Sequence, residues 1–200
     1  MTNFATLTVD LAALIANYNL LKLRHAKNSI AAVVKANAYG LGVAGVSRAL
    51  WDENCCNFFV ATFEEGIELR GILPNAMIGV FQGVFAGEEN EYISNNLTPV
   101  LNDLSQIEPF TKILNANPKI QAIIHVDTGM TRLGLCESDL KNFTLRTPNS
   151  KLIISHLACA DTPSHQKNTE QLTRFHDAIK YFPDAKYSLA NSAGVFLSQD

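Results

Sequence analysis

One lysine in this sequence has neighbours that suit a covalent reaction with a carbonyl compound. Lys35 closes the apolar run 30–34, which predicts a strand, so its amine is partly withdrawn from water. Desolvation lowers the pKa of a lysine and makes the amine a better nucleophile. Tyr39 follows four residues later in a turn bordered by Gly40, where its hydroxyl could meet a phosphate. By position alone, Lys35 could also be a strand-end lysine whose ammonium group reaches water.

Three further groups of polar residues follow apolar runs of strand length. Arg132 comes after a Gly-Met pair and is presented by a loop, where its planar fork suits a carboxylate or phenolate oxygen. His156 lies at the end of an apolar strand, and Asn191 and Ser192 begin a helical turn after the last strand. Taken singly, they could be an ion pair, a core histidine and a helix cap. Together with Lys35 they favour a site with a phosphate cradle.

Strand-like and helix-like stretches alternate along the chain. The predicted strands are residues 30–34, 58–61, 76–81, 97–101, 120–126, 151–157 and 186–189. The predicted helices between them are residues 43–51, 62–71, 86–95, 103–115, 137–143 and 162–181. Repeated strand-helix units predict a parallel sheet, and seven in series favour a (β/α)8 TIM barrel over a doubly wound sheet. A complete barrel needs about 250 residues, so this chain of 200 is expected to be a barrel truncated after about seven strands.

The barrel hypothesis predicts where the polar groups meet. The active site of a parallel barrel lies at the carboxyl ends of its strands. Lys35, Arg132, His156 and Asn191 each follow such an end, so they are expected on one edge of the sheet. Residues 6–9 alternate as a lone strand before a helix that Asp10 caps, which predicts pairing with something outside this segment.

Composition narrows the class of protein. The chain is 47% hydrophobic and 18% charged with a net charge of -3, which is typical of a globular protein and gives no reason to expect nucleic acid. No apolar stretch approaches about 18 residues, so no membrane contact is expected. Four scattered cysteines without a Cys-x-x-Cys pair fit a reducing cytosol. The first residues do not resemble a signal peptide, so we expect a cytoplasmic protein.

Four segments together resemble alanine racemase, in order and over essentially the whole chain. They are residues 32–40 (AVVKANAYG), 126–134 (VDTGMTRLG), 155–161 (SHLACAD) and 188–194 (SLANSAG). The resemblance implies a (β/α)8 barrel that binds pyridoxal 5'-phosphate (PLP), a second β-rich domain and a homodimer. It also implies interconversion of L- and D-alanine by two bases, supplying D-alanine for the cell wall.

The resemblance assigns roles to individual residues. Lys35 would hold PLP as a Schiff base and act as one of the two catalytic bases. Tyr39 and Ser192 would contact the phosphate, with Asn191 beside it. Arg132 would orient the phenolate oxygen of PLP and the substrate carboxylate.

The same resemblance places His156 against the pyridine ring of PLP. Two positions depart from the family pattern. Many relatives carry a lysine, often carbamylated, where this chain has His125, so any anionic bridge from a carbamate to Arg132 must be absent or replaced. The glycine motif after the lysine usually reads Gly-His-Gly, whereas in this chain residues 40–42 read Gly-Leu-Gly.

Chains of this family also continue well past the position that corresponds to Asp200. Their further part includes an arginine facing the pyridine nitrogen and a tyrosine that serves as the second base from the partner subunit. We therefore expect these 200 residues alone to be inactive. Residues 1–9 are expected to belong to the sheet of the absent C-terminal β-domain, and residues 10–200 to an incomplete PLP-binding barrel. Its open strand edges predict self-association of this chain, and the full-length form is expected to be a homodimer.

Three rival hypotheses stay open at the level of sequence. Residues 40–45 (GLGVAG) match the G-x-G-x-x-G pattern of dinucleotide-binding proteins. The pattern starts too far from the strand, however, and the expected acidic residue, Glu64, falls inside a helix. The second hypothesis is a single-domain barrel that binds PLP without catalysis, and the third is a racemase of serine or another small amino acid.

Overall fold

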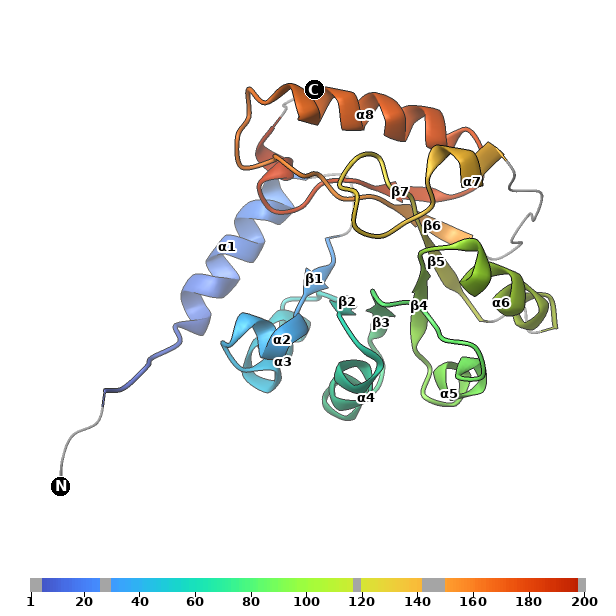
Figure 1. The fold of residues 1–200 in the computed structure, drawn as a ribbon. Helices are drawn as coiled ribbons and strands as arrows, with labels where there is room; N and C mark the ends of the chain where they lie inside the picture. Colours follow the sequence, from blue (N-terminus) through green and yellow to red (C-terminus); the bar gives the residue numbers. More distant parts are fainter. Residues whose placement is uncertain (1–4, 26–29, 117–119, 142–149, 198–200) are drawn as a thin grey trace.

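Seven parallel strands form one curved sheet in chain order. The computed structural model describes residues 5–25, 30–116, 120–141 and 150–197. The strands are β1 (Ala32–Val33), β2 (Asn57–Val60), β3 (Met77–Val80), β4 (Thr98–Leu101), β5 (Ala122–His125), β6 (Ser150–Ile154) and β7 (Lys186–Ser188). Each strand pairs with the next one in sequence, in the order β1-β2-β3-β4-β5-β6-β7. Figure 1 shows the sheet curling, which confirms the predicted barrel-type α/β fold.

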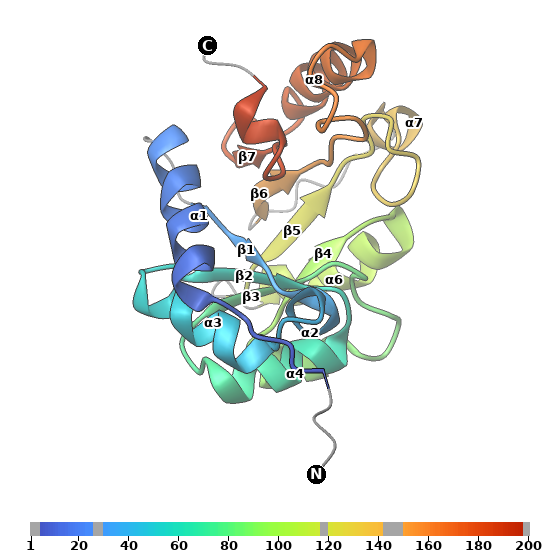
Figure 2. The ribbon, with the colours of Figure 1, turned by 90° about the vertical axis from the view of Figure 1, so that its left-hand side faces the viewer.

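Helices precede, connect and follow the strands, and the long ones lie on the outer side of the curve (Figure 1; Figure 2). They are α1 (Leu11–Arg24), α2 (Lys35–Tyr39), α3 (Val43–Asp52), α4 (Phe63–Ile72), α5 (Glu89–Ser94), α6 (Leu104–Ala116), α7 (Glu137–Lys141), α8 (Gln166–Ile179) and the 3-10 turn η1 (Gly194–Phe196). Helix α1 packs against α3 and η1. In the described ranges, no helix has the length and apolar character needed to cross a membrane.

The alternation of side chains along each strand produces two separate apolar layers. The larger layer lies between the sheet and the helices and includes Phe58, Ile78 and Ile124. The smaller layer lies on the opposite, inward face. It consists of buried Phe59, Val100, Ile123 and Ile154, with Met77, Phe81 and Leu152 packed against them. Successive residues of a strand point to opposite faces, so every second residue of β2 to β6 belongs to the inward layer.

The structure shifts several predicted boundaries, and the largest shift is at the start of the last long helix. The sequence predicts that the last long helix starts at Thr162, but α8 starts at Gln166. The carbonyl oxygen of Thr162 accepts from the amide of His165, which closes a turn instead of a helix. His165 is the N-cap, and its Nδ1 accepts from the amide of Lys167 at 3.1 Å. Histidine is an uncommon cap, whereas Thr-Pro is a common helix start, so the sequence favours the earlier position.

Of three other predictions about element ends, one is confirmed and two are not tested by the described residues. The capping box predicted at Thr62 and Glu65 is present at the start of α4. Residues 5–10 form no helix or strand with the described part of this chain. The pairing of residues 6–9 with another sheet therefore stays a prediction. The end of the predicted helix 137–143 lies outside the described residues.

Gly79 offers a test of how tightly the inward layer is packed. A Cβ atom at this position would overlap the ring of Phe59. We expect Gly79→Ala to lower the free energy of unfolding by about 1–3 kcal/mol, as overpacking of a core does. Gly71, within α4, has open space around its missing Cβ, so Gly71→Ala should leave stability unchanged or raise it by up to about 1 kcal/mol. Urea denaturation of both variants measures the difference, and equal stabilities would contradict the packing of this layer.

Candidate active site at the carboxyl ends of the strands

The inward faces of five strands end in polar or aromatic side chains at one edge of the sheet. Continuing the two-residue alternation of the inward layer leads to Phe81 after β3, Asn102 after β4, His125 at the end of β5 and His156 after β6. Lys35 follows β1, and its Nζ lies 5.9 Å from the centroid of the Phe81 ring. The lysine therefore faces the same space as the inward layer. This is the edge where the active sites of parallel barrels lie.

The backbone after Lys35 adopts a left-handed helical turn. Ala36, Asn37 and Ala38 have φ and ψ angles near +50°, and Tyr39 continues with a φ of 56°. For residues other than glycine this conformation costs about 1–2 kcal/mol each. Several such residues in succession persist only where the surroundings hold them, and strain of this kind is concentrated at functional sites. Sequence reasoning predicted a turn at this position but not its left-handed form, because residues 36–39 contain no glycine.

Two side chains hold this turn in place. Asn37 Oδ1 accepts from the amide of Val43 at 2.7 Å, which ties the turn to the start of α3. Glu65 spans two elements with its two oxygens. Its Oε1 accepts from the amide of Ala36, and its Oε2 from the amide of Ala61, both at 2.7 Å. The capping-box carboxylate of α4 therefore also fixes the residue next to Lys35.

Arg132 lies in a loop that closes on itself directly after β5. The amide of Leu135 donates to the carbonyl oxygen of His125 at 2.8 Å, and the amide of Asp127 donates to that of Leu135 at 2.9 Å. Within the loop, Asp127 Oδ1 accepts from the amides of Gly129 and Thr131. These bonds hold the two ends of the loop together, and the Arg132 side chain is exposed. The sequence predicted an arginine presented by a loop.

His156 follows β6, and the backbone around it is clamped by a residue that sequence reasoning did not single out. Gln171, in α8, is fully buried. Its Oε1 accepts from the amide of Ala158 at 2.8 Å, and its Nε2 donates to the carbonyl oxygen of His156 at 2.9 Å. The same Nε2 donates to the hydroxyl of Thr128, which joins the loop after β5. The only signal in the sequence was a polar residue on the apolar face of a helix.

Charges and burial couple the lysine, the arginine and two histidines. The pKa of His156 is lowered by burial and then by the positive charges of Arg132 and Lys35. Burial lowers the pKa of His125 to about 4; nearby Asp127 opposes this shift, whereas His156 and Arg132 add to it. Both imidazoles are therefore neutral at pH 7, and the positive charge of this site is carried by Lys35 and Arg132.

The remaining predicted site residues lie further apart. The Tyr39 ring centroid is 5.9 Å from Lys35 Nζ, and the side chain is 63% exposed. Asn191 Oδ1 accepts from the amide of Gly194 at 2.8 Å and so shapes the turn after β7. Ser192 is exposed and lines a hollow of about 310 Å³ between η1 and α1. Electrostatic effects on His156 and the distance to the Tyr39 ring thus connect Lys35 with Tyr39, Arg132 and His156, whereas no described contact joins Asn191 or Ser192 to them.

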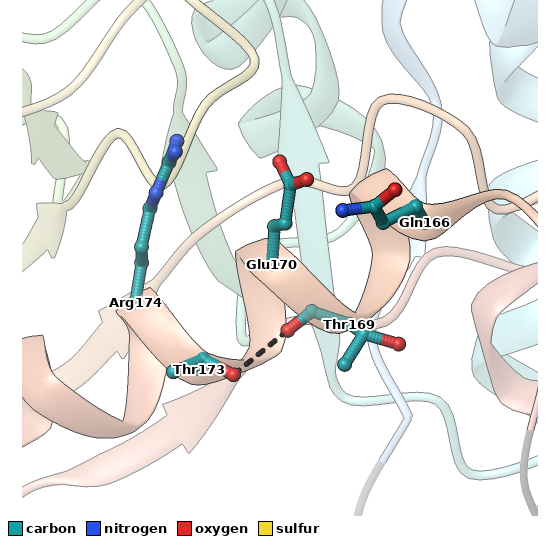
Figure 3. Close-up of a pocket in the computed structure, with 5 residues that line it drawn as sticks. All are labelled: Gln166, Thr169, Glu170, Thr173 and Arg174. Atoms are coloured by element: carbon teal, nitrogen blue, oxygen red, sulfur yellow. Dashed lines mark hydrogen bonds between the residues drawn. The ribbon is translucent and has the colours of Figure 1, made fainter.

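A second hollow of about 310 Å³ lies on the surface of α8. Figure 3 shows that it is lined by side chains of one helix only, Gln166, Thr169, Glu170, Thr173 and Arg174 of α8. A surface made by one helix cannot enclose a small molecule, so we do not consider it the active site. In the described part of the chain, no three His, Cys, Asp or Glu side chains are grouped to hold a metal ion.

The structure argues against a dinucleotide site at residues 40–45. The last glycine of that fingerprint allows close packing of helix on strand. In this chain Gly45 lies in α3 with nothing within 4 Å of the position that a Cβ would take. The left-handed turn 36–39 also separates β1 from Gly40, where the fingerprint needs a tight turn.

The fold and the site define a parallel α/β barrel domain with a strand-end lysine beside an arginine and neutral histidines. The family model described as "Alanine racemase, N-terminal domain" matches residues 9–200, and the chain belongs to this family. It is 43% identical to the alanine racemase of Rickettsia typhi over 99% of this chain and 51% of that protein. It is 41% identical to the alanine racemase of Rhizobium meliloti over 97% of this chain and 52% of that protein.

Solved structures agree with the family. The alanine racemase of Bartonella henselae, with covalently bound pyridoxal phosphate, matches with a TM-score of 0.89 and 38% identity, over 95% of this chain and 57% of that chain. The alanine racemase of Acinetobacter baumannii matches with a TM-score of 0.85 and 28% identity, over 96% of this chain and 58% of that chain. The chain spans about half the length of the curated relatives it matches.

Glu65 provides a test of how the lysine turn is held. In Glu65→Gln, one oxygen can still accept from Ala36 or Ala61, but the new amide group faces the other N–H and cannot accept. We expect the free energy of unfolding to fall by about 0.5–1.5 kcal/mol, the net contribution of one hydrogen bond between partly exposed groups. Glu68→Gln, an exposed change on the same helix, should leave it nearly unchanged. Chemical denaturation compares the two, and a Glu65→Gln variant as stable as the control would show that the carboxylate does not hold the turn.

Proposed function

We propose that these residues form the cofactor-binding part of an alanine racemase, which interconverts L- and D-alanine with PLP attached to Lys35. The observation that carries the proposal is the inward-facing Lys35 on its constrained turn, coupled by charge to His156, which in turn is coupled to Arg132. The family membership and the PLP covalently bound to the relative from Bartonella henselae support it.

The side chains present fit this cofactor. PLP carries a phosphate and a phenolate oxygen, both of which favour cationic or hydrogen-donating partners. Lys35 and Arg132 supply positive charge, and the hydroxyls of Tyr39 and Ser192 have no partner among the described residues. The nearest carboxylates are engaged elsewhere, because Glu65 and Asp127 accept from backbone amides. The oxygens of these two carboxylates that accept from the backbone are thereby turned toward amides, which leaves Lys35 and Arg132 as the cationic partners for an anionic ligand.

Each residue would have a separate task in the reaction. When bound, PLP acts as an electron sink that makes the α-hydrogen of the amino acid acidic. Lys35 Nζ removes or returns that proton on one face. The planar fork of Arg132 binds the substrate carboxylate and the phenolate oxygen. His156, kept neutral by burial and by the two cations, packs on the ring without competing with Lys35 for a proton.

A racemase also needs a base on the opposite face. We propose that it comes from outside these 200 residues, from the partner subunit of a cytoplasmic homodimer. Residues 1–9 would join the sheet of a second domain, which would explain why residues 5–9 pair with no strand in the described structure. The product, D-alanine, would serve the synthesis of the cell wall.

A labelling experiment tests the role of Lys35. The chain is incubated with PLP, reduced with borohydride, digested and mapped by mass spectrometry. We expect a pyridoxyl group on Lys35 at low PLP concentration, and none at this position in Lys35→Ala. Lys22→Ala, a change at an exposed lysine of α1, should leave the labelling of Lys35 intact. Labelling spread evenly over surface lysines, with Lys35 unmodified, would refute the proposed site.

A second measurement tests the two-base requirement. The 200-residue chain loaded with PLP should racemise L-alanine no faster than free PLP at the same concentration, because Lys35 serves one face only. Polarimetry or a coupled D-alanine assay follows the reaction. Turnover well above the free-cofactor control would contradict the assignment of the second base to residues outside this chain.

A further inference from the structure

Three long polar side chains repeat one arrangement around the sheet. Each lies in the helix that follows an even-numbered strand: Glu65 in α4, Gln106 in α6 and Gln171 in α8. Each uses one oxygen to accept from a backbone amide that follows that strand. The donors are the amides of Ala61, Asn102 and Ala158, at 2.7, 2.8 and 2.8 Å.

The same side chains also reach the end of the preceding strand. The partners there are the amide of Ala36 after β1, the carbonyl oxygen of Gln82 after β3 and the hydroxyl of Thr128 after β5, at 2.7, 3.0 and 3.2 Å. The helices that carry these side chains lie on the outer side of the sheet. The strand ends that form the site are therefore linked in pairs from the side opposite to it.

The residue type at each position matches the hydrogen-bonding groups that it meets. Both partners of Glu65 are N–H donors, and a carboxylate offers two accepting oxygens. Gln106 and Gln171 each meet one N–H donor and at least one acceptor, which an amide satisfies with its oxygen and its NH2 group. Because an N–H group cannot accept and a carbonyl oxygen cannot donate, the orientation of both glutamine amides is fixed.

Gln171 makes a further bond, to the backbone of a predicted site residue. Its Nε2 donates to the carbonyl oxygen of His156 at 2.9 Å. His156 lies two residues beyond the end of β6, so its backbone needs partners outside the strand. The hydroxyl of Thr128 in turn lies 2.8 Å from that of Ser155. Gln171, Thr128 and Ser155 are all buried, so a broken bond in this cluster leaves an unpaired polar group.

We propose that Gln171 is a positioning residue, which fixes the place of the His156 imidazole at the site by binding the backbone that carries it. Once the carbonyl group of His156 and the amide of Ala158 are held, the ring can move mainly by rotation of its own side chain. Gln171 does this from within α8, without facing a ligand. The part of the inference that concerns the cofactor rests on the function proposed above for His156, whereas the holding of its backbone does not.

Nuclear magnetic resonance of the chain without cofactor tests the holding of His156. Gln171→Glu keeps an acceptor for the amide of Ala158, but its second oxygen faces the carbonyl oxygen of His156. Gln171→Met is similar in size and loses all of these bonds. We expect both variants to shift the ring signals of His156 and to raise its pKa toward the usual histidine range. The reason is that the ring leaves its buried place beside the charges of Arg132 and Lys35.

Arg70→Lys is the matched control for a loss of stability away from the site. The Arg70 guanidinium donates to backbone carbonyl oxygens that precede β3 and β4, at the opposite ends of the strands. A lysine cannot satisfy all of them, but its His156 signals should match those of the unchanged chain. Ring signals of His156 that stay in place in a folded Gln171 variant, or that move equally in Arg70→Lys, would overturn the proposal. Gln171→Glu, which keeps its bond to Ala158, gives the result if Gln171→Met does not fold.

The affinity for PLP connects this positioning to the site. We expect Gln171→Glu to raise the dissociation constant of PLP about threefold to tenfold, the effect of one lost hydrogen bond. Arg70→Lys should leave it within about twofold, because its contacts lie at the far ends of the strands. Weakening of the same size in both variants would mean that Gln171 contributes to stability alone.

The two proposals fail separately. If Lys35 takes up no PLP, the proposed function is wrong, while the ring signals of His156 still decide whether Gln171 holds it. If PLP binds to Lys35 but the His156 signals do not respond to Gln171→Glu, only the inference about Gln171 fails.

Discussion

The site depends on the fact that a β-strand has only two faces. In this sheet one face of each strand packs under the helices, and the other packs into a small inward layer built around Phe59, Val100 and Ile123. The next inward residue at each strand end has no further layer above it. It must face the open end of the curve, whatever its chemistry. Polar residues placed there, in register across neighbouring parallel strands, are brought together by the same alternation that forms the core.

Alternation alone does not fix the direction of a long side chain such as Lys35. A second constraint acts through hydrogen bonds to the backbone. Glu65, Asn102 and Gln171 are polar side chains whose partners are mostly main-chain groups of neighbouring strand ends or loops. Each of them links two elements that are far apart in sequence. The buried members, Asn102 and Gln171, rigidify the structure most, because every broken bond there leaves an unpaired partner.

The sequence predicted the strands and their order because buried parallel strands are short apolar runs, as in 120–126. Position at a strand end was enough to place Lys35 and His156 on one edge. The start of α8 was predicted too early because His165 is an unusual cap. Asn102 and Gln171 could not be recognised, since their partners are carbonyl and amide groups whose locations follow only from the fold. The left-handed turn was also hidden, because none of its four residues is glycine.

That turn changes what the sequence around Lys35 means. A backbone with positive φ is disfavoured for all residues with a Cβ, least for asparagine and most for β-branched residues such as valine and isoleucine. Ala36 and Ala38 have no functional group, and Asn37 uses its side chain to hold α3. The residue types at positions 36–38 of this segment are therefore set mainly by the backbone conformation of the turn and not by contact with a ligand. In this segment, only Lys35 and Tyr39 carry groups that could touch a ligand, and the residues between them are those that allow the chain to reverse direction there.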